Sequence, residues 1–357
     1  MNKKIKLLEL FAGVGGFALG LKEAGFEIEK HYFSEILPHS IANYKHNFKD
    51  SIHVGNVKLV RRIIKTVGRP DVITFGSPCQ DFSLAGKGRG LGGDRSSLIK
   101  FAVFLVRWLR PNFFIWENVK GAYSTNDGAD YWAIIKAFTD LHGYRLEQQL
   151  VNTSWVLPQN RERIYLIGHL TGASEPRVFP FTGENFGISS ETEKKRGKGQ
   201  RFQNENNATA ITKRYGNNST ETLVQVKKAI PLREVRTDEA KEDRKRNRAA
   251  GRDTNSFRGK MIEERDDDLT GCLSSAPTND NLLLYKETSE IRKLTEIECE
   301  RLQGFPDDWT KYGLYEDGKV KPIPKTARYE MLGNAVTVKI VKAIGERLLI
   351  DQNIKFI

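Results

Sequence analysis

Residues 71–83 read DVITFGSPCQDFS. The run that follows the leading Asp is short, apolar and rich in β-branched and aromatic residues, which is typical of an interior strand of a parallel sheet. This strand is predicted to end at Gly76, and Cys79 then lies just past its carboxyl end. Ligands of open α/β sheets bind at that edge, so Cys79 is a candidate nucleophile. A free cysteine is more often a small buried hydrophobic residue, and Cys79 considered on its own leaves this alternative open.

Strand-like and helix-like segments alternate through the first 170 residues. Short apolar runs predict strands at residues 5–11, 31–35, 71–75, 113–117, 144–152 and 164–170. Longer amphipathic or apolar segments predict helices at residues 16–24, 37–48, 96–110 and 131–141. The alternation predicts an α/β fold with a doubly wound, Rossmann-like sheet that carries helices on both faces.

The pattern changes at about residue 183, where Gly, Asn, Ser, Thr and charged residues begin to dominate. Only short strand candidates occur there, at residues 222–226 and 282–285, so we expect a smaller, loop-rich inserted domain. Regularity returns at Thr295, which has capping-box spacing to Glu298, and a last amphipathic helix is expected at residues 336–349. The predicted units are a first domain, an insert, a segment linking back and a C-terminal part that completes the first domain: residues 1–180, 181–290, 291–325 and 326–357.

The net charge of the 357-residue chain is +12, and most of it lies in one segment. Residues 194–260 hold 19 Lys or Arg against 8 Asp or Glu, which is 11 of the 12 excess charges. A basic excess confined to one segment indicates a polyanionic partner, most simply nucleic acid. A solvated linker with incidental lysines is the alternative that composition leaves open.

Other features of the sequence exclude several classes of protein. No apolar run approaches the roughly 18 residues that span a bilayer, and the first residues lead into a strand rather than a signal peptide. We therefore expect a cytoplasmic protein without a membrane partner. The three cysteines, Cys79, Cys272 and Cys299, are too few and too scattered for a disulfide framework or a zinc site, so no metal is expected.

A glycine-rich turn, FAGVGGF at residues 11–17, follows the first predicted strand. Such a turn lets the backbone approach a ligand, and Glu35, at the tip of the next strand, can accept hydrogen bonds from ribose hydroxyls. NAD is compatible with this feature alone. Phe17 could stack on an adenine or fill the core, and the same ambiguity applies to Ile36.

Two further motifs carry a resemblance to a known family. Residues 116–119 read WENV, with a carboxylate at a strand tip, and residues 159–163 read QNRER ahead of another strand. Together with the motifs above, the sequence resembles the DNA (cytosine-5)-methyltransferase family, of the kind found in bacterial restriction-modification systems. The resemblance covers nearly the whole chain outside residues 183–290. Six motifs stand in the family's order: residues 11–17, 76–83, 117–119, 159–163, 292–306 and 333–336.

The resemblance implies a covalent mechanism. Carbon 5 of cytosine is a poor nucleophile until a thiolate adds to carbon 6, and Cys79 would be that thiolate. Glu117, protonated or sharing a proton with ring nitrogen 3, would stabilise the electron-rich ring, because a buried carboxyl has the raised pKa that this role requires. Arg163, and less directly Arg161, would neutralise an oxygen or phosphate of the target nucleotide. A surface ion pair with Glu162 is the alternative for both arginines.

The family's methyl donor is S-adenosyl-L-methionine, with S-adenosyl-L-homocysteine as product, and the resemblance implies both here. The implied cofactor contacts are Phe11, Ala12, Gly13, Gly15, Gly16, Phe17, Glu35, Ile36, Asn56, Val57, Pro78, Asn334 and Ala335. One position departs from the family: Gly55-Asn56-Val57 stands where a Gly-Asp-Ile sequence is usual. Asn56 can still accept a hydrogen bond from an adenine amino group, but without the charge.

Double-stranded DNA is the expected partner, with the insert as target recognition domain. The target base must swing out of the helix, and residues 84–95, rich in glycine and basic residues, have the composition of a mobile lid that closes over it. Basic side chains would contact phosphates and polar ones base edges. The expected DNA contacts are Gln80, Ser83, Lys87, Arg89, Arg95, Arg201 and Arg214.

Three alternatives remain distinct from this interpretation. The tRNA-directed branch of the same family differs around the nucleophile and has a smaller recognition segment. A binding module without chemistry would lack a catalytic residue, whereas Cys79, Glu117 and Arg163 are all present. An NAD-dependent oxidoreductase would leave residues 159–163 unexplained. We further expect a monomer and a cognate restriction endonuclease that acts on the same site.

Overall fold

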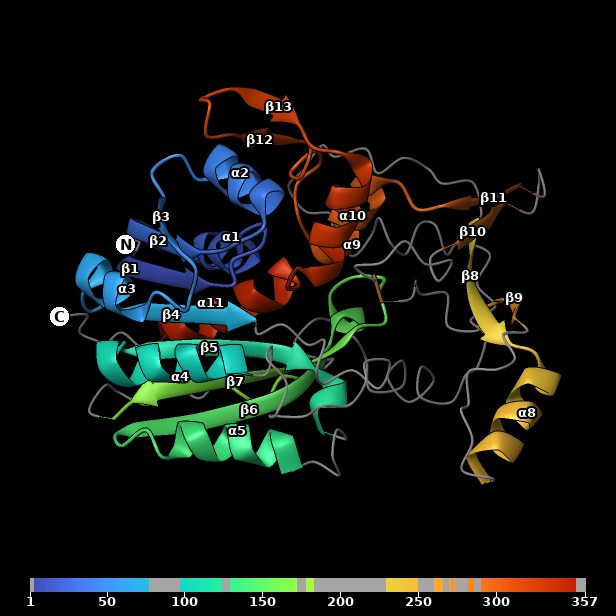
Figure 1. The fold of residues 1–357 in the computed structure, drawn as a ribbon, viewed down its shortest axis with the longest axis horizontal. Helices are drawn as coiled ribbons and strands as arrows, with labels where there is room; N and C mark the ends of the chain where they lie inside the picture. The colour runs from blue at the N-terminus through green and yellow to red at the C-terminus, as the bar shows by residue number, and fades with distance from the viewer. Residues whose placement is uncertain are drawn as a thin grey trace.

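The structure is a computed structural model with two sheets and a hairpin in its described part (Figure 1). The smaller sheet lies to one side of the larger one in this view. The structure describes residues 3–76, 97–123, 129–171, 178–182, 229–249, 260–265, 270, 272–273, 282–285 and 290–350.

The larger sheet has seven strands in the order β3-β2-β1-β4-β5-β7-β6. They are β1 Lys3–Leu10, β2 Phe26–Ser34, β3 Ile52–Gly55, β4 Val72–Gly76, β5 Phe113–Val119, β6 Tyr144–Asn152 and β7 Glu162–Leu170. Strands β1 to β5 are parallel, whereas β7 is antiparallel to both of its neighbours. The predicted doubly wound α/β sheet is confirmed. The reversal of β7 was not predicted, because an apolar run does not indicate strand direction.

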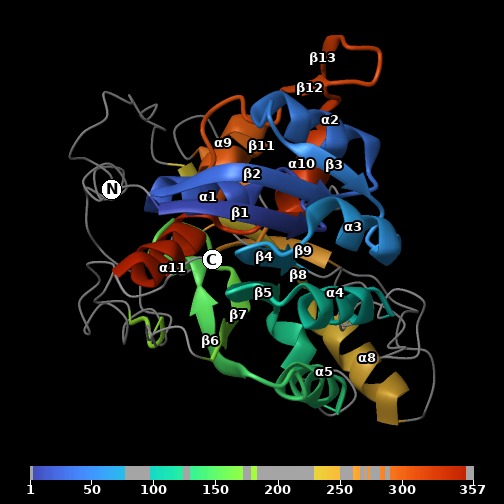
Figure 2. The same cartoon turned by 90° about the vertical axis from the view of Figure 1, so that its left-hand side faces the viewer.

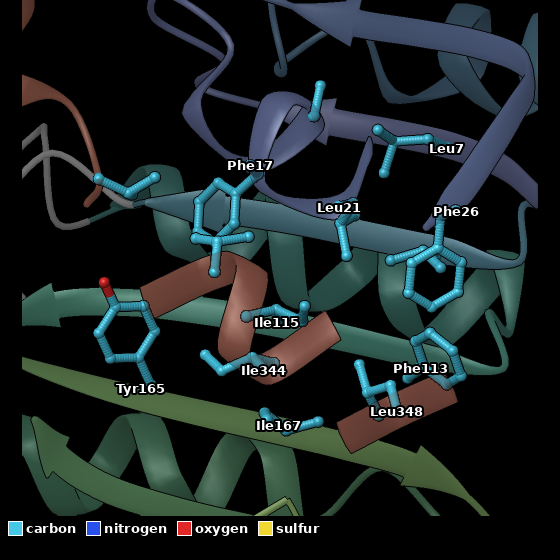
Figure 3. Packing of buried hydrophobic residues seen from close by; sticks show 14 of the residues in the cluster. Leu7, Phe17, Leu21, Phe26, Phe113, Ile115, Tyr165, Ile167, Ile344 and Leu348 are labelled. Carbon is cyan, nitrogen blue, oxygen red and sulfur yellow. The ribbon is translucent and has the colours of Figure 1, made fainter. Parts of the chain in front are cut away.

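Helices cover both faces of this sheet. One face carries α1 Gly16–Ala24, α2 Pro38–Asn47 and α11 Val338–Ile350, and the other carries α3 Val60–Val67, α4 Ser97–Leu109 and α5 Ala129–Thr139. Figure 2 shows α11 and α4 on opposite sides of the strands. Neighbouring residues of β5 alternate between the two cores, as the pleat of a strand requires: Ile115 belongs to the first and Trp116 to the second. Figure 3 shows the first core, in which Phe17 and Leu21 of α1 face Ile344 of α11.

The strand order places a topological switch point between β1 and β4, where open α/β sheets have a crevice for ligands. Strand β1 pairs with β2 on one side and with β4 on the other, so the chain segments that follow β1 and β4 lead away from each other. Ligands of such folds bind outside the carboxyl ends of these strands, at one edge of the sheet. Because β7 is antiparallel, its first residues lie at this same edge, with Arg163 opposite Val119 of β5. Side chains that follow β1, β4 and β5, and those that begin β7, are therefore gathered together.

The second sheet is antiparallel, in the order β11-β10-β8-β9. Its strands are β8 Ala229–Arg236, β9 Lys260–Glu264, β10 Leu282–Tyr285 and β11 Glu290–Lys293, and helix α8 Asp238–Ala249 follows β8. The strand predicted at residues 282–285 is present as β10, and the candidate at residues 222–226 lies outside the described residues. The division of the chain at residues 181 and 290 stays a prediction.

The C-terminal part returns to the larger sheet. Helix α9 Glu296–Gln303 begins with the predicted capping box: Thr295 Oγ1 accepts the Glu298 N–H, and the Glu298 side chain accepts the Thr295 N–H. The remaining elements are the hairpin β12 Tyr312–Leu314 and β13 Val320–Pro322, α10 Lys325–Asn334 and α11. Helix α11 begins two residues after the predicted start at residue 336.

Candidate active site

The turn after β1 forms one wall of the crevice. Phe11, Gly13 and Gly15 have φ angles of 52°, 54° and 82°, a left-handed backbone that glycine adopts without steric cost. A Cβ on Gly13 would meet no atom within 4 Å, so open space lies beside this residue. Gly15 is the N-cap of α1, and the N–H groups of a helix N-terminus favour polar or anionic ligand groups.

Glu35 is anchored against this turn. Its Oε2 accepts the Gly13 N–H at 2.9 Å, and its Oε1 accepts the N–H groups of Ile36 and Leu37 at 2.7 and 3.0 Å. A carboxylate has about four acceptor positions, so three backbone donors fix its orientation and leave capacity for another donor. Ile36 is 61% exposed and presents an apolar surface beside this carboxylate.

Asn56 and Val57 follow the next strand, β3. Asn56 Oδ1 accepts the Lys58 N–H at 2.9 Å, and Val57 is buried in the core. Any contact of the Asn56 carbonyl with an adenine amino group would therefore share an oxygen that the local turn already uses.

Phe17 and Ala12 lie beneath the turn. The Phe17 side chain is 3% exposed and packs in the core shared by α1 and α11 (Figure 3). Of the two roles left open for Phe17, the structure gives its side chain the core position. Ala12 is also buried, and its N–H donates to Ser34 O at 3.1 Å, which holds the turn against β2.

The segment between α10 and α11 packs onto the start of α1. A Cβ on Gly16 would come within 2.7 Å of Val336 Cγ2 and 3.3 Å of Val336 O, so only glycine permits this approach. Asn334 is exposed at the end of α10, and Ala335 is buried. The contact brings both residues to the glycine turn, although they lie far from it in the sequence.

The side chains of Glu117 and Arg163 are buried and paired at the end of β5. Arg163 Nε lies 3.1 Å from Glu117 Oε1, and the two side chains are 13% and 8% exposed. The residue opposite Glu117 on β4 is Gly76, where a Cβ would lie 3.2 Å from Oε2. Burial raises the pKa of the Glu117 carboxyl above its ordinary value, although Arg163 and Arg161 act in the other direction. A carboxyl in this state can hold a proton and donate it.

Arg161 is buried and bonded differently from the expectation. Its guanidinium donates to Ala335 O at 2.7 Å, Gly333 O at 3.2 Å, Cys272 Sγ at 3.2 Å and Leu273 O at 3.4 Å. These bonds join two distant segments to the start of β7, so Arg161 acts as a clamp within the protein, and its contact with a nucleotide oxygen stays a prediction. The alternative for Arg161 and Arg163 was a surface ion pair with Glu162. Glu162 instead pairs with Lys120, with Oε2 at 2.7 Å from Nζ.

Two buried residues of the site region were missed from the sequence. Cys272 contacts both Arg161 and Arg163, but nothing in the sequence indicates that its segment docks on residues 158–163. Glu9 is buried within β1, where its Oε2 accepts the Ala18 N–H at 3.2 Å and the Tyr44 hydroxyl at 2.8 Å. For Glu9 a signal existed, since strand alternation sets it on the face that α1 covers.

Several predicted site residues lie outside the described residues. They are Pro78, Cys79, Gln80, Ser83, Lys87, Arg89, Arg95, Arg201 and Arg214. The described chain reaches Gly76, which β4 sets beside Glu117.

Within the described ranges, no group of three or more His, Cys, Asp or Glu side chains is arranged to hold a metal ion. In the same part of the chain, no helix is long and apolar enough to cross a membrane.

Comparison with protein families decides the chemistry of this crevice. The model of the C-5 cytosine-specific DNA methylase family matches residues 5–349. The chain belongs to this family. It is a DNA (cytosine-5)-methyltransferase, its substrate is DNA and its methyl donor is S-adenosylmethionine, as the motifs predicted.

Relatives of this methyltransferase span nearly all of the chain. The type II methyltransferase M1.ScrFI of Lactococcus lactis subsp. cremoris is 28% identical over 97% of this chain and 78% of its own length. The type II methyltransferase M.HpaII of Haemophilus parainfluenzae is 27% identical over 98% of this chain and 90% of its own length. The crystal structure of the S. pombe Dnmt2 methyltransferase has a TM-score of 0.59 and 17% identity, over 98% of this chain and 99% of that one. At that identity the likeness concerns the fold.

Proposed function

We propose that this methyltransferase modifies carbon 5 of a cytosine within a specific duplex DNA sequence, through a transient bond between Cys79 and carbon 6. The observation that carries the proposal is the Glu117 carboxyl, which is buried at the end of β5 beside Gly76 and paired with Arg163. Cys79 follows Gly76 by three residues, so the sequence tethers the thiol to the strand end next to this carboxyl.

Cys79 and Glu117 divide the work on the ring. The Cys79 thiolate adds to carbon 6, and the electron pair of the carbon 5–carbon 6 bond becomes available at carbon 5. Glu117 donates its proton, or a hydrogen bond, to ring nitrogen 3 and so stabilises the charge that addition creates. Loss of the carbon 5 proton and of the thiolate, with return of the nitrogen 3 proton to Glu117, later restores the aromatic ring. Arg163 holds the Glu117 side chain in place at 3.1 Å.

The crevice fits S-adenosylmethionine, which supplies an activated methyl group when bound. The open space beside Gly13 gives room for a ligand against the backbone, and Glu35 keeps an acceptor position for a ribose hydroxyl. Ile36 offers an apolar surface for the adenine. The proposed holding set otherwise comprises Phe11, Gly15, Gly16, Asn56, Val57, Pro78, Asn334 and Ala335, with Ala12 and Phe17 supporting the turn from the core.

The basic insert is proposed to read the DNA. The excess of positive charge at residues 194–260 supports phosphate binding, and Arg201 and Arg214 are proposed contacts within it. Gln80, Ser83, Lys87, Arg89 and Arg95 are proposed to contact the extruded nucleotide and its strand. The type II names of the relatives support membership of a restriction-modification system, with a cognate endonuclease as proposed partner. A monomeric methyltransferase is proposed as well.

A covalent trap tests the proposal. Genomic fragments synthesised with 5-fluorocytosine are incubated with the protein and S-adenosylmethionine, because fluorine at carbon 5 cannot leave as a proton and the adduct persists. We expect a conjugate that survives denaturation and maps to Cys79. Cys79→Ala should bind DNA but give no conjugate, whereas Cys299→Ser should give as much as the natural chain. No conjugate, or one at Cys272 or Cys299, would contradict the assignment.

Bisulfite sequencing of DNA from cells expressing the chain then defines the methylated site. A specific sequence context supports the proposal, whereas methylation scattered over all contexts would contradict sequence specificity.

A further inference from the structure

The segment that returns from the insert docks on the start of β7. Thr270 donates from its N–H and its hydroxyl to Pro158 O, at 3.1 and 3.0 Å, and Asn160 N–H donates to Thr270 O at 3.0 Å. Gln159 and Thr270 form a parallel bridge. Cys272 follows two residues later and is thereby held beside the arginines of β7.

The sulfur of Cys272 lies between two guanidinium groups. Arg161 Nη1 is 3.2 Å from Sγ and Arg163 Nη2 is 3.4 Å from it. A neutral thiol is a weak acceptor, whereas a thiolate accepts charge-assisted hydrogen bonds from guanidinium donors. Two cationic donors directed at one sulfur therefore favour the anion.

The charges around the sulfur lead to the same conclusion. The titratable groups that face this cluster in the described residues are Arg161, just before β7, Arg163 and Tyr165 of β7, and Glu117 of β5. Burial acts to raise the pKa of the Cys272 thiol, but Arg161 and Arg163 together bring it below its ordinary value. The pKa of Glu117 is shifted upward by burial. The two guanidinium groups that contact Sγ, at 3.2 and 3.4 Å, thus favour a negative charge on the sulfur beside Arg163.

We propose that Cys272, as a thiolate, is a positioning residue that holds Arg163 against Glu117 and ties the catalytic carboxyl to the segment returning from the insert. The proposal rests on the proposed role of Glu117. The thiolate compensates the charge of Arg163, so Glu117 does not have to ionise to do so and keeps the proton that it donates to the ring. The Arg163 guanidinium spans the two groups, with Nε on Glu117 and Nη2 on Cys272.

Removing the negative charge should shift the pH dependence of turnover in a defined direction. Without the thiolate, Arg163 favours the ionised form of Glu117 and the pKa of Glu117 falls. Turnover requires the protonated carboxyl, so the basic limb of the kcat profile moves to lower pH. A shift of about one pH unit corresponds to about a tenfold loss of kcat above the limb.

The first test measures kcat against pH for the full-length chain and its variants. Cys272→Ser, which keeps a polar group but not the anion, should shift the basic limb to lower pH with little change in KM for S-adenosylmethionine. Cys272→Asp restores an anion and should move the limb back. Cys299→Ser, in the core of α9, is the matched control and should give the profile of the natural chain. Superimposable profiles for Cys272→Ser and the natural chain would overturn the proposal.

The second test needs no methyl transfer. The natural chain is alkylated with iodoacetamide over a range of pH, and each cysteine peptide is followed by mass spectrometry. Cys272 should reach half-maximal rate below pH ~8.5, the midpoint of an ordinary thiol. Cys299, whose pKa burial raises to about 12, should remain unreactive there. If the pH of half-maximal alkylation of Cys272 is at or above that of a free thiol, the proposal that Cys272 is a thiolate is overturned. This result does not depend on the outcome of the fluorocytosine trap on Cys79.

Discussion

Arg163 Nε lies 3.1 Å from Glu117 Oε1 because the two residues belong to antiparallel neighbours, β5 and β7. Glu117 comes near the end of its strand and Arg163 near the start of the next. In a parallel arrangement these positions would lie at opposite edges of the sheet. The reversal of β7 therefore delivers a cation to the carboxyl ends of the strands, where the ligands of this fold bind.

Glu117→Gln should lower kcat by about 10²–10⁴-fold, because the amide cannot transfer a proton to the ring. Equilibrium binding of S-adenosylmethionine should change little, since Glu117 belongs to β5 and the proposed cofactor residues to other elements. Steady-state kinetics measures the fall in kcat, and calorimetric titration measures the binding of S-adenosylmethionine. An unaltered kcat would remove Glu117 from the mechanism.

Arg161→Lys should lower the free energy of unfolding by about 2–4 kcal/mol. Lysine keeps the charge but cannot reach Gly333 O, Ala335 O and the sulfur of Cys272 together, so buried carbonyls lose their donors. Denaturant unfolding measures the loss. The exposed Arg69, which also donates to a backbone carbonyl, is the control, and Arg69→Lys should cost less than about 1 kcal/mol. Equal losses of unfolding free energy in Arg161→Lys and Arg69→Lys would contradict the role of Arg161 as a clamp.

Glu9→Gln should change how stability depends on pH. Burial raises the pKa of the Glu9 carboxyl from 4.5 to about 8, although Tyr44 and the N–H groups of Ala18 and Phe17 bond to it. The folded chain therefore keeps a proton that the unfolded chain releases, and the contribution of Glu9 to stability falls as pH rises through this window. Gln does not titrate.

The free energy of unfolding of Glu9→Gln, relative to the natural chain, should thus increase by a few kcal/mol between about pH 4.5 and about pH 8 and level off above it. Denaturant unfolding at several pH values measures the difference. A difference that stays constant over the window would show that Glu9 is ionised in the folded state.

Gly16→Ala should destabilise the chain by about 1–3 kcal/mol and weaken binding of S-adenosylmethionine. The added methyl would lie 2.7 Å from Val336 Cγ2, so the segment carrying Asn334 must move away from the turn. The double variant Gly16→Ala/Val336→Ala removes the closest contact, that with Val336 Cγ2, and should recover part of the cofactor affinity. Binding that is no tighter in the double variant than in Gly16→Ala alone would contradict this account.

Much of the sheet could be predicted from local pattern. Strand β6 and helix α1 have the predicted bounds, because each is a periodic segment with clear ends. Strand β3 was missed because four residues are too few for a clear strand pattern. Helix α3 was missed although Val60, Ile63, Ile64 and Val67 have the spacing of an amphipathic helix, so a signal existed there. Strand β8 was missed in the insert, where polar composition pointed to loops.

In the candidate site, too, some residues could be predicted from local pattern and others could not. The turn, Glu35 and Glu117 each sit at the end of a predicted strand, so the rule that such ends share one edge brings them together. The contacts of Arg161 depend instead on how Leu273 and Gly333 dock against β7. That docking is tertiary, and no spacing within QNRER reveals it.

The packing of α1 against α11 has a consequence for how the chain is made. Phe17 and Leu21 are covered by Ile344 and Leu348, from the opposite end of the sequence (Figure 3). On the ribosome, α1 emerges first and its apolar side has no cover until the last helix is synthesised. We expect the nascent polypeptide to rely on chaperones for most of its translation, and a stop codon before Val338 to yield an aggregating product even though every strand of the large sheet is present.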